Sequence, residues 1–361
     1  MKTDVLGRAL AGLLLALLAG CEQPAEPPQG FAGLGSEAAA FTPVLPGRSF
    51  SFPADHGAHD GFRIEWWYLT ADLSDAQGRH FGVQWTLFRS ALRAAPEQLG
   101  WGAPLVWLGH AAATSAQSHH ATERYARGGV GQAGVIAQPF QAWIDDWQLS
   151  TLNSAGDPLA RMQVQAAGPG FAYRLQLSSS RPLVLQGEGG YSRKSDQGQA
   201  SYYYSQPFFQ AAGELQIDGQ RYQVSGPAWL DREWSSQPLG ADQSGWDWFS
   251  LHLDSGERLM LFRVRERDKA PYITGTWIST DGHTQSLGKE QIQLLPLAQS
   301  RVQGRSLPTT WQLRIPAKGL DITTRALNPQ AWMNLSIPYW EGPLQFAGSH
   351  SGSGYLEMTG Y

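Results

Sequence analysis

The chain has 361 residues, more than one hydrophobic core usually serves, so we expect two domains. Its formal net charge of −4 argues against a nucleic-acid partner, because nucleic-acid-binding domains usually carry a basic surface. Charged residues make up only 16% of the sequence, whereas glycines number 41 and tryptophans 15. Low charge with many aromatic and turn residues is typical of all-β domains with an aromatic-lined interior.

The N-terminal 20 residues have the form of a secretory signal peptide. Lys2 and Arg8 precede an apolar stretch over residues 10–19. This stretch is too short to cross a membrane, which takes about 20 residues, but it suits the apolar region of a signal peptide. Residues 18–21 resemble the lipobox of bacterial lipoproteins and end in the only cysteine of the chain, Cys21. We therefore predict that Cys21 carries a lipid; the alternative is an ordinary secretory signal with a chance cysteine.

A lipid on Cys21 determines both location and chemistry. Two or three acyl chains hold a protein firmly on a membrane surface. Glu22 follows Cys21, in place of the aspartate that commonly retains such proteins at the inner membrane, so we favour the outer membrane. We expect a periplasm-facing lipoprotein of the cell envelope. Lipidation also leaves the mature protein without a thiol nucleophile, a disulfide or a cysteine-bound metal.

Residues 21–48 are predicted to be a flexible tether, because prolines stand among glycines and alanines without an amphipathic period. The folded body is expected from residue 49 onward, where short alternating runs are separated by glycine, proline and polar turns. In one such run Phe171, Tyr173 and Leu175 share a strand face. No long stretch of the sequence has a convincing helical period, so we predict an all-β fold.

Three segments recur in the same order, which indicates a duplicated unit. Residues 65–73, 213–219 and 226–231 align with residues 245–253, 342–348 and 352–357. The extra length lies inside the first copy, and residues 235–244, with Pro238 and Gly240, are the expected junction. We predict an N-terminal domain over residues 49–236 and a C-terminal domain over residues 237–361. A duplicated up-and-down β unit implies two barrel-like halves, since closure removes exposed strand edges.

Aromatic-rich motifs are spread over the whole body of the chain. They are His56-Gly57-Ala58-His59, Arg63-x-Glu65-Trp66-Trp67-Tyr68, Asp231-Arg232-Glu233-Trp234, Gly245-Trp246-Asp247-Trp248-Phe249, Tyr339-Trp340-Glu341-Gly342 and Gly354-Tyr355-Leu356-Glu357-Met358-Thr359-Gly360-Tyr361. In these motifs the sequence resembles the carotenoid 1,2-hydratase (hydroxyneurosporene synthase) family and its secreted lipocalin-like relatives, often labelled predicted secreted hydrolases. The resemblance implies two tandem lipocalin-like antiparallel β-barrels. It leaves the activity open, and the lipoprotein signal fits the secreted, transporter-associated branch better than the photosynthetic hydratases.

Four carboxylates beside aromatic residues are the candidate catalytic groups. They are Glu65, Asp231, Asp247 and Glu357. A carboxyl in an apolar pocket has a raised pKa and is an acid near neutral pH, while a second carboxylate orients water as a base. Aromatic faces stabilise a cation formed on an alkene. The competing interpretation is structural, because buried carboxylates usually pair with arginines.

Other site chemistry has less support in the sequence. His56 and His59 suggest a metal, but no third ligand is evident and a hydrogen-bonded loop histidine is the simpler interpretation. The sequence has no Gly-x-Ser-x-Gly elbow, which counts against a conventional serine hydrolase. We therefore expect neither a metal nor a cofactor.

Two functions follow from this sequence. We favour a membrane-tethered carrier that binds a hydrophobic lipid or isoprenoid in a lipocalin-like pocket, with an ABC-type transporter as a possible partner. The alternative is a cofactor-independent hydratase or hydrolase that uses the carboxylates. The candidate ligand-binding residues are aromatic: Trp66, Tyr68, Trp229, Trp246, Trp248 and Tyr355.

Barrel closure would pair the first strand of each repeat with its last. This pairing would place residues 65–66 beside residues 229–231, and residues 246–247 beside residues 355–357. Directly opposed side chains on adjacent strands lie roughly 5 Å apart. We therefore expect Glu65 to lie close to Asp231, with one pKa raised unless an arginine intervenes.

Overall fold

A computed structural model describes residues 39–94, 100–152 and 156–361. The predicted signal peptide, Cys21 and the tether up to residue 38 lie outside these ranges. Within them, no helix combines the length and the apolar character needed to cross a membrane. The helical elements of the described ranges are short 3-10 turns: η2 (Ala54–His56), η3 (Gly100–Gly102), η4 (Lys289–Gln291) and η5 (Pro316–Lys318).

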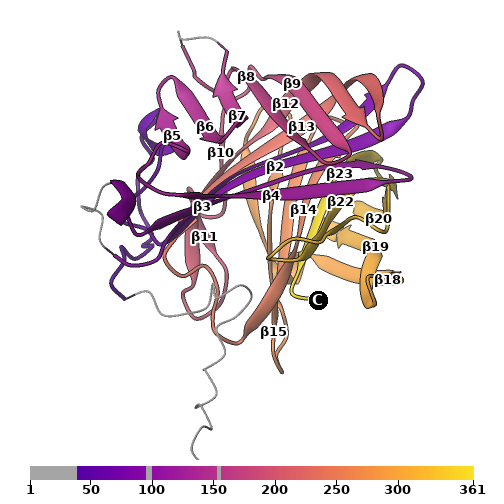
Figure 1. The fold of residues 1–361 in the computed structure, drawn as a ribbon. Coiled ribbons are helices and arrows are strands. Elements are labelled where there is room, and N and C mark those ends of the chain that lie inside the picture. Colours follow the sequence, from indigo (N-terminus) through magenta and orange to yellow (C-terminus); the bar gives the residue numbers. More distant parts are fainter. Residues whose placement is uncertain (1–38, 95–99, 153–155) are drawn as a thin grey trace, which may run out of the picture.

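The first half of the described chain forms one antiparallel sheet, in the order β4-β3-β2-β1-β13-β12-β9-β8-β7-β6-β5. Its shorter strands β5–β9 fold over β1–β4 (Figure 1). The strands are β1 (Ile64–Asp75), β2 (His80–Ala91), β3 (Leu105–Ser115), β4 (His119–Arg127), β5 (Ala133–Ala137), β6 (Phe140–Ile144), β7 (Trp147–Thr151), β8 (Arg161–Gly168), β9 (Phe171–Ser178), β10 (Val184–Leu185), β11 (Tyr191–Arg193), β12 (Ala200–Ile217) and β13 (Gln220–Ser235).

The second half forms a second sheet, in the order β17-β16-β15-β14-β23-β22-β20-β19-β18. Its strands are β14 (Gln243–Leu253), β15 (Arg258–Glu266), β16 (Tyr272–Ile278), β17 (Thr284–Gly288), β18 (Gln293–Val302), β19 (Arg305–Ile315), β20 (Leu320–Ala326), β21 (Trp332–Met333), β22 (Tyr339–Gly348) and β23 (Gly352–Thr359). Strand for strand this is the order of the first sheet without β5 and β6. The all-β fold of two tandem lipocalin-like units is therefore confirmed, and the β5–β6 hairpin is one part of the extra length of the first copy.

Each sheet joins its first strand to its last, as the repeat predicts. In the first sheet Tyr68 of β1 stands opposite Asp231 of β13. In the second sheet Trp248 of β14 stands opposite Glu357 of β23. The two edge strands of each sheet are not hydrogen-bonded to each other; they are β4 and β5 in the first sheet and β17 and β18 in the second. Each unit is thus a curled sheet that stops short of full closure.

The concave interior of each sheet is filled by its own side chains. Alternate residues of β1, among them Trp67 and Leu69, point into the first interior, where Trp85 and Trp147 are also fully buried. In the second sheet Phe249 and Trp311 have the same role. A lipocalin keeps its ligand inside the barrel, but here large aromatic residues occupy that space.

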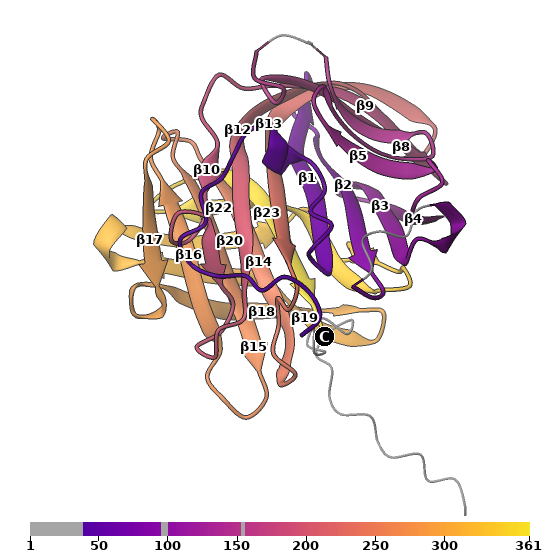
Figure 2. The same cartoon turned by 90° about the vertical axis from the view of Figure 1, so that its left-hand side faces the viewer.

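The opposite faces of the central strands pack against each other and join the two sheets. This inter-sheet cluster combines Tyr68, Tyr203 and Trp229 of the first sheet with Trp248 and Phe262 of the second. Figure 2 shows the indigo strands β1–β4 on one side, the orange strands β15–β17 on the other, and β12 and β13 between them. Because side chains alternate along β1, successive residues point in turn into the first interior and into the inter-sheet cluster.

The folded body begins before residue 49. Thr42 donates its N–H to the carbonyl oxygen of Gly61, and Leu45 exchanges hydrogen bonds with the hydroxyl of Tyr202. Val44 packs against the first core. The end of the predicted tether is thus bound along the first sheet. Prolines at positions 43 and 46 fit this path, because the N–H groups that donate hydrogen bonds belong to Thr42 and Leu45.

Candidate functional site between the sheets

A cavity of about 200 Å³ lies between the two sheets, on the faces that carry the inter-sheet cluster. Its walls are mostly aromatic and aliphatic, with a few polar groups from both halves of the chain. The apolar lining includes Trp66, Phe88, Leu108, Leu239, Trp246, Trp248, Phe262 and Ile337, and the polar lining includes Tyr68, His110, Lys194, Tyr203, Asp231, Glu233, Tyr339 and Glu357. An apolar recess with a few convergent polar groups is the usual form of a ligand or catalytic site.

Asp231 reaches this cavity from β13 of the first sheet. Its carboxyl accepts hydrogen bonds from the hydroxyls of Tyr203 (2.6 Å) and Ser205 (2.5 Å), and from the indole of Trp229 (2.6 Å). Burial raises its pKa to about 7, although the three donors pull in the other direction. The carboxyl of Asp231 therefore gains or loses its proton near neutral pH, in largely apolar surroundings.

Glu357 occupies the matching position on β23 of the second sheet. Its carboxyl accepts a hydrogen bond from the indole N–H of Trp246. Burial raises its pKa to about 7, and the nearby charges of Asp231 and Glu233 add to that rise. The cavity thus brings one carboxyl from each repeat into electrostatic contact, and at neutral pH one of them can be protonated while the other is ionised.

A third carboxyl, Glu341, lies behind the cavity wall, directly opposite Glu357 on the neighbouring strand β22. It is fully buried and accepts hydrogen bonds from the hydroxyls of Tyr68 and Tyr339. Its second oxygen, Oε2, has no hydrogen-bond partner among the described residues. Burial and repulsion from Glu357 raise the pKa of Glu341 well above its usual range, which favours the protonated form of this carboxyl.

A hydrogen-bonded chain continues from Glu341 across the back of the cavity. The Tyr339 hydroxyl lies 3.0 Å from Nδ1 of His110, which is buried on β3. Burial lowers the pKa of His110 to about 3, so its imidazole is neutral. Histidine, tyrosine and carboxyl groups are therefore held together without a net positive charge, in line with the apolar character of the cavity.

The cation of the cavity is Lys194. Its Nζ lies 2.7 Å from Oε1 of Glu233 and 4.4 Å from the centre of the Phe262 ring. Glu233 stands on the same face of β13 as Asp231 and also accepts a hydrogen bond from Ser201. Glu233 thus compensates the positive charge of Lys194 at the cavity wall. A charge that is removed from water needs such a partner of opposite sign.

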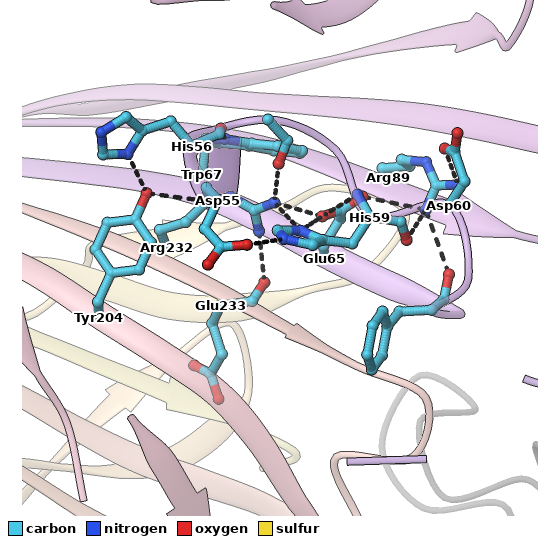
Figure 3. Close-up of polar contacts among 12 residues, drawn as sticks. Asp55, His56, His59, Asp60, Glu65, Trp67, Arg89, Tyr204, Arg232 and Glu233 are labelled. Carbon is cyan, nitrogen blue, oxygen red and sulfur yellow. Dashed lines mark hydrogen bonds and ion pairs between the residues drawn. The ribbon is translucent and has the colours of Figure 1, made fainter. Parts of the chain in front are cut away.

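Glu65 points to the opposite side of the first sheet from Asp231, into a network of ion pairs (Figure 3). Its carboxylate contacts the guanidinium groups of Arg232 and of Arg89, the latter at 3.1 Å, and the ring of His59. Although burial acts in the opposite direction, these partners lower its pKa to about 2. The expected proximity of Glu65 and Asp231 is wrong, because adjacent strands place these side chains on opposite faces of the sheet.

The two histidines of the first motif belong to this same network. His59 stacks on Trp234, with 4.0 Å between ring centres, and its Nε2 lies 3.0 Å from Asp55. His56 bonds through Nδ1 to the hydroxyl of Tyr204 at 2.7 Å. Within the described ranges, no three His, Cys, Asp or Glu side chains form a group that could hold a metal ion.

Asp247 is the counterpart of Glu65 in the second sheet. It points into the second interior and contacts Arg263 at 2.7 Å, Arg265 at 2.8 Å and the hydroxyl of Tyr361 at 2.7 Å. It does not line the cavity. Of the four carboxylates predicted from the sequence, the fold therefore brings Asp231 and Glu357 together, and it holds Glu65 and Asp247 in separate arginine clusters.

Four of the six predicted aromatic ligand contacts line the cavity: Trp66, Tyr68, Trp246 and Trp248. The other two lie in the inter-sheet cluster without lining the cavity. Trp229 is fully buried and donates to Asp231. Tyr355 packs near Pro343, on the strand beside its own.

Sequence reasoning missed several groups of this site, chiefly Glu233, Glu341, Tyr203, Lys194 and His110. The first two stand inside motifs that were recognised, and strand parity places Glu233 on the face of Asp231. The signal was thus available for these two carboxylates. Tyr203, Lys194 and His110 lie outside the recognised motifs, and only long-range strand pairing brings them to the cavity.

Fold and site together define a two-sheet, lipocalin-like protein with a carboxyl-bearing apolar cavity between its halves. Residues 43–361 match the AttH-like family, and the chain belongs to that family. An AttH from Nitrosomonas europaea shares 32% sequence identity and a TM-score of 0.77, over 89% of this chain and 100% of that chain. These matches confirm the resemblance to the carotenoid hydratase-like, lipocalin-like branch that the motifs predicted.

Two more distant crystal structures share the fold. Kievitone hydratase from Nectria haematococca has 14% identity and a TM-score of 0.65, over 89% of this chain and 98% of that chain. CghA with Sch210972 has 12% identity and a TM-score of 0.50, over 82% of this chain and 88% of that chain. No curated protein matches this sequence.

Proposed function

We propose that this protein is a cofactor-independent hydro-lyase that adds water to, or removes it to form, a carbon–carbon double bond in an apolar substrate. One observation carries the proposal: Asp231 and Glu357 face the same apolar cavity from the two sheets, each with a pKa of about 7. The name of the kievitone hydratase, which has the same fold, and the resemblance to carotenoid 1,2-hydratases support it. These supports favour the enzyme over the carrier that we preferred from the sequence.

The surroundings of the two carboxyls suggest different roles. Asp231 accepts three hydrogen bonds, which stabilise its anion, so Asp231 is the base in our proposal. Glu357 accepts one from Trp246 and stands opposite buried Glu341, so Glu357 is the acid. In hydration, protonated Glu357 gives its proton to one alkene carbon, and the other carbon becomes cationic.

Water completes the reaction. It attacks the cationic carbon as Asp231 accepts one of its protons, so the elements of H₂O are added and the two carboxyls exchange protonation states. Proton transfer through the solvent restores them. Trp246 and Trp248 line the cavity where the cation would form, and aromatic rings stabilise desolvated cations by about 2 kcal/mol or more.

The proposal is tested with Asp231→Asn and Glu357→Gln. Each should lower kcat by about 10²–10⁴-fold, because general acid–base catalysis contributes that much. Binding of the same alkene, followed by Trp fluorescence, should change little, because the apolar walls remain. The assay is incorporation of ¹⁸O from labelled water into a panel of isoprenoid and phenolic alkenes.

The matched control is Glu214→Gln, at a carboxyl on β12 that does not line the cavity. It should leave ¹⁸O incorporation unchanged. Tight binding of the panel without any ¹⁸O incorporation by the wild type would reject the enzyme. That result would instead support the carrier function. Trp66→Ala and Trp246→Ala should then weaken ligand uptake, and substitution of Asp231 or Glu357 should have little effect.

We also propose, from the sequence, that the protein is anchored in the cell envelope through Cys21 and faces the periplasm. Labelling with a palmitate analogue should then depend on Cys21, and the label should fractionate with the outer membrane. Labelling that persists in Cys21→Ala would contradict the anchor. An ABC-type transporter partner remains a prediction, which co-purification from crosslinked membranes would check.

A further inference from the structure

A second cavity, of about 750 Å³, lies where the first sheet meets the β15 end of the second. Its lining is unlike that of the site between the sheets, because cationic and hydroxyl side chains dominate it. Three arginines come from different elements: Arg161 from β8, Arg181 from the loop after β9, and Arg258 from β15. Ser178 and Ser180 are among the serines beside them, and no carboxylate lines this arginine cavity.

Two of the arginines are fixed by the backbone and by a shared aromatic ring. Arg258 donates through Nε to the carbonyl of Pro207 at 3.1 Å, and through Nη1 to two further carbonyls. Arg181 donates through Nη1 to the carbonyl of Thr280. The guanidinium carbons lie 5.3 Å and 5.8 Å from the ring centre of Phe208. Their positions are therefore set before any ligand arrives, which lowers the entropic cost of binding.

Their charges lack a carboxylate partner. Within the described part of the chain, neither Arg161, Arg181 nor Arg258 forms an ion pair, and Nη2 of Arg181 and of Arg258 has no acceptor. Burial lowers the pKa of Arg258 to about 10, and repulsion from Arg181 adds to this. The neighbouring Glu257 attracts Arg258, although the two side chains do not form an ion pair. Arg161 and Arg181 are exposed and Arg258 is partly buried, so three cations share one open recess whose lining residues include no carboxylate. This concentration of positive charge favours an external anion.

We propose that the arginine cavity binds a phosphate group through Arg181 and Arg258, with Arg161 at the rim. A phosphate dianion offsets two neighbouring positive charges better than a monoanion does. The planar forks of arginine also suit its oxygens. The group can belong to a soluble phosphate ester or to an anionic lipid headgroup. Because Arg161 and Arg181 belong to the first half of the chain and Arg258 to the second sheet, a bound phosphate joins the two halves.

The test uses the mature, unlipidated protein and inorganic phosphate. Phosphate should raise Tm in a concentration-dependent way, compared with chloride at the same ionic strength, because a ligand that binds only the folded state stabilises it. Arg181→Gln and Arg258→Gln should each weaken phosphate binding, measured by calorimetry, at least tenfold. Arg221→Gln, an exposed arginine on β13, makes the same charge change outside the cavity and should bind like wild type.

Two further measurements make the result decisive. Among the described residues the side chain of Arg161 forms no hydrogen bond, so Arg161→Gln should weaken phosphate binding without loss of stability, even if Arg258→Gln fails to fold. Glycerol 3-phosphate and vesicles of phosphatidic acid in phosphatidylcholine distinguish the two sources, and arginine-dependent binding of either supports the site. Equal affinity for phosphate in wild type and all three variants, or no effect beyond ionic strength, would overturn it.

Discussion

Carboxyls of one chain acquire opposite properties from their surroundings. Glu65 is buried against Arg232 and Arg89, and its pKa falls to about 2. Asp231 is equally buried but receives only neutral donors, and its pKa rises to about 7. Both residues stand in recognised motifs two or fewer residues from a tryptophan. The charge of the partner, rather than burial, decides which carboxyl can serve as an acid or base at neutral pH.

Asp231→Asn should change how stability depends on pH. The pKa of Asp231 is about 7 in the folded protein and 3.8 when unperturbed, so the folded state holds a proton that the unfolded state has lost. The contribution of this group to stability therefore falls as pH rises from about 4 to about 7 and is constant above. The stability of wild type minus that of Asp231→Asn should fall by up to about 1.4 kcal/mol per pH unit.

Urea denaturation across this range measures the difference. Asp321→Asn is the control, because hydrogen bonds from Gln312 and Arg314 lower the pKa of Asp321. The stability that Asp321 contributes is present above its unfolded pKa and is lost only at more acidic pH. The stability of wild type minus that of Asp321→Asn should therefore be level from pH 5 to 7. A constant or rising difference for Asp231→Asn over that interval would contradict a raised pKa.

At the scale of single elements, alternation along the central strands separates structure from function. Odd-numbered residues of β1 and of β14 fill the two interiors, and even-numbered residues meet between the sheets. Glycine is needed where the backbones of two paired strands come close together. A Cβ on Gly354 of β23 would lie 2.0 Å from the carbonyl oxygen of Ser250 on β14, the strand that carries Trp248.

Gly354→Ala should therefore destabilise the second sheet. The added methyl group would have to displace backbone, and overpacking of this kind costs about 1–3 kcal/mol. Thermal unfolding followed by circular dichroism measures the loss. Gly288→Ala at the end of β17 is the matched control, because a Cβ there meets no atom within 4 Å and its φ is −91°. Equal Tm values for the two variants would contradict the close approach of β14 and β23.

At the scale of the whole molecule, the two sheets depend on each other. Trp248 of the second sheet packs edge to face on Tyr68 and on Trp229 of the first, with ring centres 5.3 Å and 6.3 Å apart. The proposed catalytic carboxyls come one from each sheet. Neither half therefore contains the site by itself, and stability and function share one interface.

Trp248→Ala should weaken both sheets at once. Loss of a buried tryptophan costs about 3–5 kcal/mol, and here the resulting cavity opens between the sheets. Hydrogen exchange in mild denaturant should lose protection in β1 and β13 as well as in β14. Trp101→Ala, at a tryptophan that is 75% exposed, should change neither. Loss of protection confined to the second sheet would mean that the sheets unfold independently.

The sequence by itself determined the all-β class, the duplication and the pairing of first with last strands, because alternation and repeat order are local patterns. It also selected Asp231, Glu357 and four of the aromatic residues that line the cavity. Only the tertiary structure decided that the cavity lies between the sheets rather than inside a barrel. Which partner a residue such as Glu65 or Asp231 meets depends on the opposite strand face and on the second sheet, and those contacts join residues far apart in the chain.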